Sequence, residues 1–349
     1  MALAAVLACQ KTDRAAEGAG LLLSINDGTE LVATRATGTA AALLENESKI
    51  NSVQVFVFNA DGTIDNCKRY TDGVTAPGRW TMPAPLKCVS GSKDVWVLVN
   101  VPTDYTVSGV LAKSDLLAKT FTMGDMTPTS LIMTGHRDGE VFPADAPLAL
   151  TMTVERVVCA VSLVKVYNRM MNASYRSSVV INGAFLMQAP GIQNVEGTIL
   201  ASSDASPYSS WYGHHAKETG NALFTDAITA YTIPYWNSNP STCYSEIHTF
   251  YCMPSDIGYA AGSDPSARVL NDGTDIKSST YLDAEISVNG RAYYYPIVLP
   301  KLERNKKYNV VLNVEHIGSN NPWSVVSFTD FTPSITVTNW TEVSLSETI

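Results

Sequence analysis

Two sites for covalent processing lie near the start of the sequence. The run Val6-Leu7-Ala8-Cys9 has the form of a lipobox, in which the cysteine is acylated with lipid and the residues before it are removed. Arg35 precedes Ala36 among small polar residues, a context that a trypsin-like protease accepts. The sequence therefore predicts a lipid-modified precursor, with a signal over residues 1–9, that is cut after Arg35.

A short β-strand is expected between these two processing sites. Leu21, Leu23 and Ile25 alternate with other residues, and the turn signal Asn26-Asp27-Gly28 follows them. A cut after Arg35 would remove this strand as part of a propeptide over residues 10–35. A strand that is made and then cut away would leave the folded protein incomplete.

The C-terminal tail, residues 334–349, has a pattern similar to the removable strand. Apolar residues alternate with Ser and Thr in two runs, and we expect a donor strand with no partner in its own domain, formed by Ile335, Val337, Val343, Leu345 and Ile349. A missing strand exposes a groove, and each aliphatic side chain buried there contributes ~1.5–3 kcal/mol. A tail from another copy could fill it by β-augmentation, and such head-to-tail contacts propagate as filaments. Which of the two runs would be donated stays open.

The sequence offers little sign of a metal site or a catalytic site. His214-His215 is a histidine pair without a third ligand at recognisable spacing, so we expect a surface loop and no metal site. Paired carboxylates, a Gly-x-Ser-x-Gly nucleophile and a glycine-rich phosphate loop are not identifiable. We therefore predict a protein that is not an enzyme and has no cofactor.

Composition limits the classes of partner. The formal charge is −9, and no basic cluster could follow a phosphate backbone, so nucleic acid is not an expected partner. After Cys9 the chain has five scattered cysteines without metal-binding spacing. Cys67 could pair with Cys88, and Cys243 with Cys252, in an oxidising compartment, whereas Cys159 is expected to be a buried thiol.

Period-two alternation dominates the rest of the chain. Short strands with Gly, Pro, Asn and Asp between them predict an all-β protein of two tandem β-sandwich domains, 36–147 and 148–349, with one short helix within 110–119. The segments expected to be strands are 53–58, 95–101, 148–166, 249–253, 281–288, 291–299 and 308–314.

The order of several motifs resembles the fimbrillins, the type V pilins of the Bacteroidia, along nearly the whole chain. Besides Cys9 and Arg35-Ala36, the motifs are Val55-Phe56-Val57-Phe58, Glu155-Arg156-Val157-Val158-Cys159-Ala160-Val161, Phe250-Tyr251-Cys252-Met253-Pro254, Leu302-Glu303-Arg304-Asn305-Lys306-Lys307-Tyr308 and Thr336-Val337-Thr338-Asn339-Trp340. The resemblance implies transthyretin-like sandwiches and export as an outer-membrane lipoprotein. It also implies cleavage by an arginine-specific protease and polymerisation with like subunits, anchor subunits and tip subunits into an extracellular fimbria. Because both Arg35 and the tail are present, a stalk subunit is favoured.

The alternative interpretation is a lipid-anchored monomeric adhesin that binds a host or glycan ligand. Aromatic residues that could stack on sugar rings are Tyr208, Trp211, Tyr212, Tyr231, Tyr235 and Trp236. Such residues in a β-sandwich more often pack in the core or against loops. Loss of glycan binding in Trp211→Ala would support the alternative.

Overall fold

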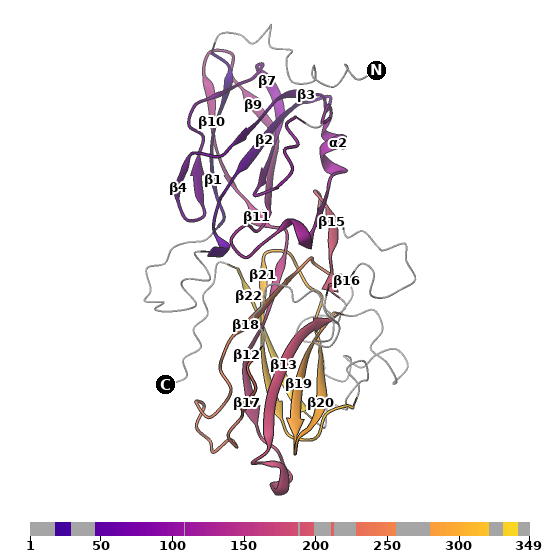
Figure 1. Ribbon diagram of the computed structural model, residues 1–349. Coiled ribbons are helices and arrows are strands. Elements are labelled where there is room, and N and C mark those ends of the chain that lie inside the picture. The colour runs from indigo at the N-terminus through magenta and orange to yellow at the C-terminus, as the bar shows by residue number, and fades with distance from the viewer. Residues whose placement is uncertain are drawn as a thin grey trace. The chain divides into compact units, whose positions relative to one another are not determined.

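The computed structural model describes residues 18–28, 46–107, 109–187, 189–198, 211–212, 228–255, 280–320 and 331–340. The chain divides into two compact units (Figure 1). Unit 1 comprises the chain up to Val157 together with Gln193–Thr198, and unit 2 comprises Val158–Ile192 and the chain from Ile199 onward.

Unit 1 contains two five-stranded sheets. One has the order β10-β1-β5-β4, with β6 also paired to β1, and the other has the order β11-β9-β7-β2-β3. A further short pair joins β8 and β15. The elements are β1 (Gly20–Asn26), β2 (Val53–Asn59), β3 (Ile64–Tyr70), β4 (Val74–Ala76), β5 (Arg79–Thr81), β6 (Leu86–Lys87), β7 (Gly91–Val99), α2 (Lys113–Leu117), β8 (Thr120–Thr122), the 3-10 turn Met123–Asp125, β9 (Met133–Phe142), β10 (Pro147–Thr153), β11 (Glu155–Arg156) and β15 (Ile192–Asn194).

The core of unit 1 lies between its two sheets. Buried residues of β1 and β10 in one sheet belong to the same cluster as Val55, Val97 and Met133 of the other. Alternate residues of a strand point to opposite faces, so each sheet contributes one apolar face to this core. Unit 1 is therefore a β-sandwich.

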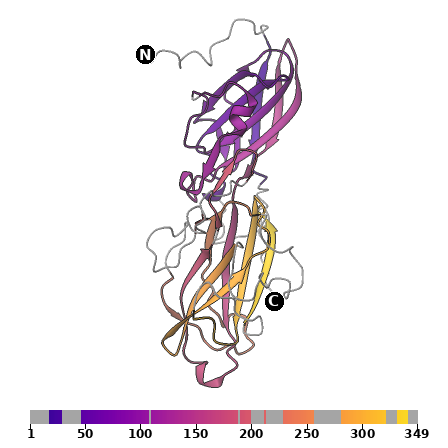
Figure 2. The same ribbon diagram turned by 90° about the vertical axis from the view of Figure 1, so that its right-hand side faces the viewer.

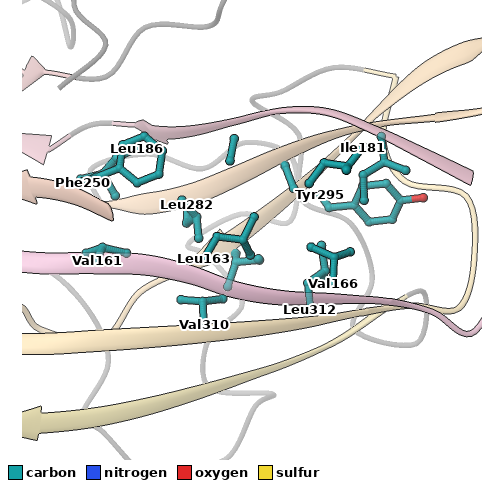
Figure 3. Packing of buried hydrophobic residues seen from close by; sticks show 14 of the residues in the cluster. Val161, Leu163, Val166, Ile181, Leu186, Phe250, Leu282, Tyr295, Val310 and Leu312 are labelled. Atoms are coloured by element: carbon teal, nitrogen blue, oxygen red, sulfur yellow. The ribbon is translucent and has the colours of Figure 1, made fainter. Parts of the chain in front are cut away.

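Unit 2 is a second sandwich, made of the sheets β18-β12-β21-β22 and β17-β13-β19-β20, with a small β14-β16 pair. Its core joins both sheets through residues such as Leu163, Leu282 and Val310 (Figure 3). The last strand, β22, lies at the edge of its sheet (Figure 2, yellow). The elements are β12 (Cys159–Asn168), the 3-10 turn Ala173–Tyr175, β13 (Val179–Met187), β14 (Ala189–Pro190), β16 (Trp211–Tyr212), β17 (Tyr231–Thr232), β18 (His248–Cys252), β19 (Tyr281–Val288), β20 (Arg291–Val298), β21 (Lys306–Val314) and β22 (Phe331–Asn339).

The predicted all-β class is confirmed, and so is the hairpin across Asn289-Gly290. Both turn residues have positive φ, 50° and 77°, as a tight turn between β19 and β20 requires. The expected boundary after Pro147 differs from the division in the structure. The stretch from Pro147 to Thr153 pairs in parallel with β1, so it belongs to unit 1, and the division falls after Val157.

Among the described residues, no helix is long and apolar enough to cross a membrane.

Candidate functional site

The candidate site is β1 and the groove that holds it. β1 lies inside its sheet, parallel to β10 over seven residue pairs from Gly20↔Pro147 to Asn26↔Thr153. On its other side it pairs antiparallel with β5 and β6. Removing β1 would therefore leave unpaired backbone groups on β10, β5 and β6.

One face of β1 is part of the core of unit 1. Leu21 and Leu23 are fully buried and Ile25 is 2% exposed, whereas Leu22 between them is 37% exposed. Burial of three such side chains contributes ~5–9 kcal/mol, which is comparable to the whole stability of an ordinary domain. The three residues predicted to form a removable strand are thus central to the fold of unit 1.

A buried ion pair follows directly after the strand. Asp27 continues the alternation of Leu21, Leu23 and Ile25, and its carboxylate Oδ2 lies 2.6 Å from Nη2 of Arg156. Both side chains are buried, at 1% and 0% exposure. Arg156 also donates to the backbone oxygen of Glu47 at 3.1 Å and to Ser48 Oγ at 3.1 Å. Asp27 and Arg156 thereby tie the end of β1 to β11.

Gly78 allows this ion pair to form. Its carbonyl accepts a hydrogen bond from the Asp27 N–H at 2.9 Å, and its φ is +67°. A Cβ at this position would clash with Oδ1 of Asp27. The left-handed conformation and the close approach both require glycine. The other end of β1 fits closely too, since a Cβ on Gly20 would lie 2.8 Å from the Leu86 oxygen.

Part of the expected donor tail has a partner in its own unit. Ile335 and Val337 lie in β22, which pairs with β21 over nine positions. Ile335 packs against the core of unit 2, whereas Val337 is 38% exposed. Trp340, 1% exposed, stacks on Tyr251 with ring centroids 6.0 Å apart. The expectation of a terminal strand without a partner is therefore wrong for Ile335 and Val337, because β21 pairs with it in register.

Several predicted site residues lie outside the described residues. They are Cys9, Arg35, Ala36, Val343, Leu345, Ile349 and the pair His214-His215. Within the described part of the chain, no group of three or more His, Cys, Asp or Glu side chains could hold a metal ion.

The five later cysteines are buried free thiols. Cys252 does not face Cys243. It lies opposite Cys159 across β12 and β18, with 3.3 Å between the sulfur atoms. The hydrogen bond with Cys159 and burial raise the pKa of Cys252 well above its usual range. The expectation that Cys159 is a buried thiol is confirmed.

Arginines cover two of the candidate sugar-stacking aromatics. The guanidinium carbon of Arg176 lies 4.2 Å from the ring centroid of Tyr235, and that of Arg169 lies 4.1 Å from the ring centroid of Trp236. These cation–π contacts are typical of side chains that pack against the protein itself. Tyr231 and Tyr235 nevertheless remain 43% and 40% exposed.

Comparisons with known proteins point to fimbrial subunits. Residues 21–144, which begin within β1, match the family model for the major fimbrial subunit protein (FimA). The whole chain is 22% identical, over 97% of its relative, to the major fimbrium subunit FimA type-2 of Porphyromonas gingivalis. The chain thus resembles the fimbrillins in part of its sequence and, at low identity, along its whole length. Fimbrillins are fimbrial subunits and not a family of enzymes.

Solved structures share the fold of this chain. A putative cell adhesion protein from Parabacteroides distasonis aligns with a TM-score of 0.62 at 14% identity, over 93% of this chain and 99% of its own. A fimbrilin (FimA) from Porphyromonas gingivalis aligns with a TM-score of 0.57 at 16% identity, over 92% and 98%. Both alignments span the two units, which agrees with the two-sandwich architecture.

Sequence reasoning gave no role to two residues of the site. Asp27 is part of a predicted turn signal, and Arg156 is part of a motif that carries the family resemblance. A signal was present for Asp27, because it occupies the next position on the buried face after Ile25. No local pattern could have shown that the two residues meet, since 129 positions separate them.

Proposed function

We propose that this protein is a fimbrillin, a stalk subunit of a surface fimbria that polymerises by strand exchange. It is exported as a lipoprotein acylated on Cys9, and an arginine-specific protease cuts it after Arg35. β1 then leaves, and a C-terminal strand of another copy takes its place. Anchor and tip subunits complete the fimbria, which serves adhesion.

The observation that carries this proposal is the position of β1. It is an internal strand of unit 1, it supplies three buried side chains to the core, and its chain continues toward Arg35. A strand so placed is hard to release from an ordinary domain, because release opens the core. The same groove is therefore well suited to bind a replacement strand strongly.

The pairing of β22 supports one choice of donor within the tail. Freeing Ile335 would break the pairing of β22 with β21, whereas residues 341–349 follow β22 in the sequence and take no part in that pairing. We therefore assign the donor to residues 341–349, which contain Val343, Leu345 and Ile349.

The first experiment is limited trypsin digestion of the purified precursor, followed by mass measurement of the new N-terminus and negative-stain microscopy. We expect a cut between Arg35 and Ala36 and then filaments. Arg35→Ala should prevent both, and Arg14→Ala, a matched change in the same leader, should prevent neither. Deletion of residues 341–349 should give subunits that accept a donor and cannot donate. Monomers that persist after a clean cut would contradict polymerisation and support the anchored adhesin.

A further inference from the structure

Cys159 and Cys252 form a close pair of thiols in the core of unit 2. Cys159 is the first residue of β12, Cys252 is the last residue of β18, and the two are direct partners in the antiparallel ladder. Directly opposite residues carry their side chains on the same face of a sheet, and both cysteines belong to the core cluster at 0% exposure. Their sulfur atoms lie 3.3 Å apart. The register of the two strands therefore holds the thiols against each other.

The position suits a disulfide. The bond requires a Cα–Cα separation of about 4.4–6.8 Å, and directly opposite residues of antiparallel strands lie about 4.5 or 5.5 Å apart. To form it, the two sulfur atoms approach from 3.3 Å to about 2.0 Å. Cys243 has a different neighbour, because its sulfur contacts the backbone oxygen of Pro240 at 3.5 Å. The geometry thus favours Cys159 as the partner of Cys252.

We propose that Cys159 and Cys252 form a disulfide that joins β18 to β12 in the exported protein. This inference rests on the proposed function only for export, which brings the chain into an oxidising compartment. The structure shows the pair in its reduced form. β18 is an edge strand of the described sheet, and β12 is its neighbour there. The bond therefore fixes an edge strand covalently to the interior of the sheet.

Thiol–disulfide exchange produces the bond. The oxidant is itself a disulfide, of a small thiol or of a protein. The thiolate of one cysteine attacks it, forms a mixed disulfide and releases the first thiol of the oxidant. The thiolate of the second cysteine then attacks the sulfur of the first, so that the Cys159–Cys252 bond forms and the second thiol of the oxidant leaves. Two protons and two electrons pass from the pair to the oxidant.

Burial determines when this exchange takes place. Both thiols are fully buried, and the hydrogen bond with Cys159 together with burial raises the pKa of Cys252. Because the thiolate is the reactive form, the pair reacts slowly once unit 2 is folded. We therefore expect the bond to form while unit 2 folds, and the closed core then protects it from reduction.

The test is oxidative refolding of the purified full-length protein in a glutathione redox buffer, followed by alkylation in denaturant and peptide mass mapping. Trypsin leaves Cys159 in the peptide 157–165, and Cys243 and Cys252 together in the peptide 218–268. We expect these two peptides to be linked, at about 2 Da below the sum of their separate masses. The link should persist in Cys243→Ala, the matched control from the same peptide, and should be absent in Cys252→Ala. Oxidised glutathione added to the folded, reduced protein should produce the link more slowly than refolding does.

A second measurement reads what the bond does. Because 93 positions separate the two cysteines, the bond restricts a long loop of the unfolded chain. The thermal midpoint of unit 2 should be higher by roughly 5–15 °C in the oxidised protein than in the reduced protein. Cys243→Ala should show the same difference between its two forms, and Cys252→Ala should show none.

Two results would overturn the proposal. One is alkylation of both Cys159 and Cys252 after oxidative refolding, and the other is a link that survives in Cys252→Ala, because Cys243 would then be the partner. Should Cys252→Ala fail to fold, the linked peptides of Cys243→Ala still identify the pair. The link is read by mass and needs no filaments, so its absence would leave the proposed polymerisation standing, and a failure to polymerise would leave the link standing.

Discussion

Asp27 and Gly78 show how closely the end of β1 is fitted at the scale of single residues. The carbonyl of Gly78 holds the Asp27 backbone, and its missing side chain leaves room for the Asp27 carboxylate that reaches Arg156. Buried ion pairs are sensitive to such geometry, since the desolvation of both charges is offset only by close, well-directed contacts.

Gly78→Ala is expected to destabilise unit 1 of the precursor by about 2–4 kcal/mol. The new Cβ would both strain a positive φ and displace the Asp27 carboxylate. Gly62→Ala is the matched control, because Gly62 also has a positive φ, +83°, and has no atom within 4 Å of a built Cβ. Thermal unfolding followed by circular dichroism measures both. Equal losses of stability would mean that strain alone acts at Gly78.

Asp283 gives unit 2 a predictable pH dependence. Burial raises the pKa of this carboxyl well above its usual range, and among the described residues its Oδ2 has no hydrogen-bond partner. The folded state therefore holds a proton that the unfolded state releases. The free energy of unfolding is largest below the ordinary pKa near 4 and falls as the pH rises toward the raised value.

Asp283→Asn should flatten this dependence and make unit 2 more stable at neutral pH than the native protein. Denaturant unfolding between pH 4 and pH 8 measures the slope. Asp61→Asn serves as the surface control, because hydrogen bonds from Thr63 lower the pKa of Asp61 and place its titration below this window. If the free energy of unfolding of unit 2 in the native protein rose with pH between 4 and 8, the raised pKa of Asp283 would be contradicted.

At the scale of elements, β1 combines a buried and an exposed face in one short strand. Leu23→Ala should destabilise the precursor by about 2–5 kcal/mol, because Leu23 is fully buried in the core of unit 1. Leu22→Ala, one residue away, should change stability by less than about 1 kcal/mol, since Leu22 points to the other face. Both effects are read from the midpoint of denaturant unfolding. Similar losses would mean that β1 does not keep this register.

The sequence predicted those elements whose signals are local. Alternation and the Asn289-Gly290 turn located β19 and β20 closely, and Val53–Phe58 located β2. The parallel pairing of β10 with β1 could not be read in this way, because no turn connects strands so far apart in the sequence. The predicted division between residues 147 and 148 differs from that in the structure for the same reason, because long-range pairing with β1 places Pro147–Thr153 in unit 1.

The donor tail illustrates a related limit. Apolar residues alternate with Ser or Thr in both runs of the tail, at Ile335 and Val337 and again at Val343 and Leu345. Pattern alone could not show that the first run pairs within its own unit. The pairing of β22 with β21 and the burial of Trp340 show this for residues 331–340. The candidate site was thus half predictable: its apolar residues were visible in the sequence, and its ion pair was not.

At the scale of the whole molecule, each unit has its own sheets and its own core. The proposed cleavage and strand exchange change only the core of unit 1. Differential scanning calorimetry should therefore resolve two transitions that respond separately. Leu163→Ala should lower only the transition of unit 2, because Leu163 is fully buried there.

Cleavage after Arg35 with loss of β1 should lower only the transition of unit 1. The loss is large, because the groove is left without three buried side chains and without the carboxylate on Arg156. Addition of the 341–349 peptide should raise this transition again with peptide concentration, as expected for a ligand that binds only the folded state. The thermal transition of unit 2, which Leu163→Ala identifies, should keep the same midpoint temperature throughout. If both transitions moved together, the two units would unfold as one cooperative body, and polymerisation would stabilise the subunit as a whole and not through a single groove.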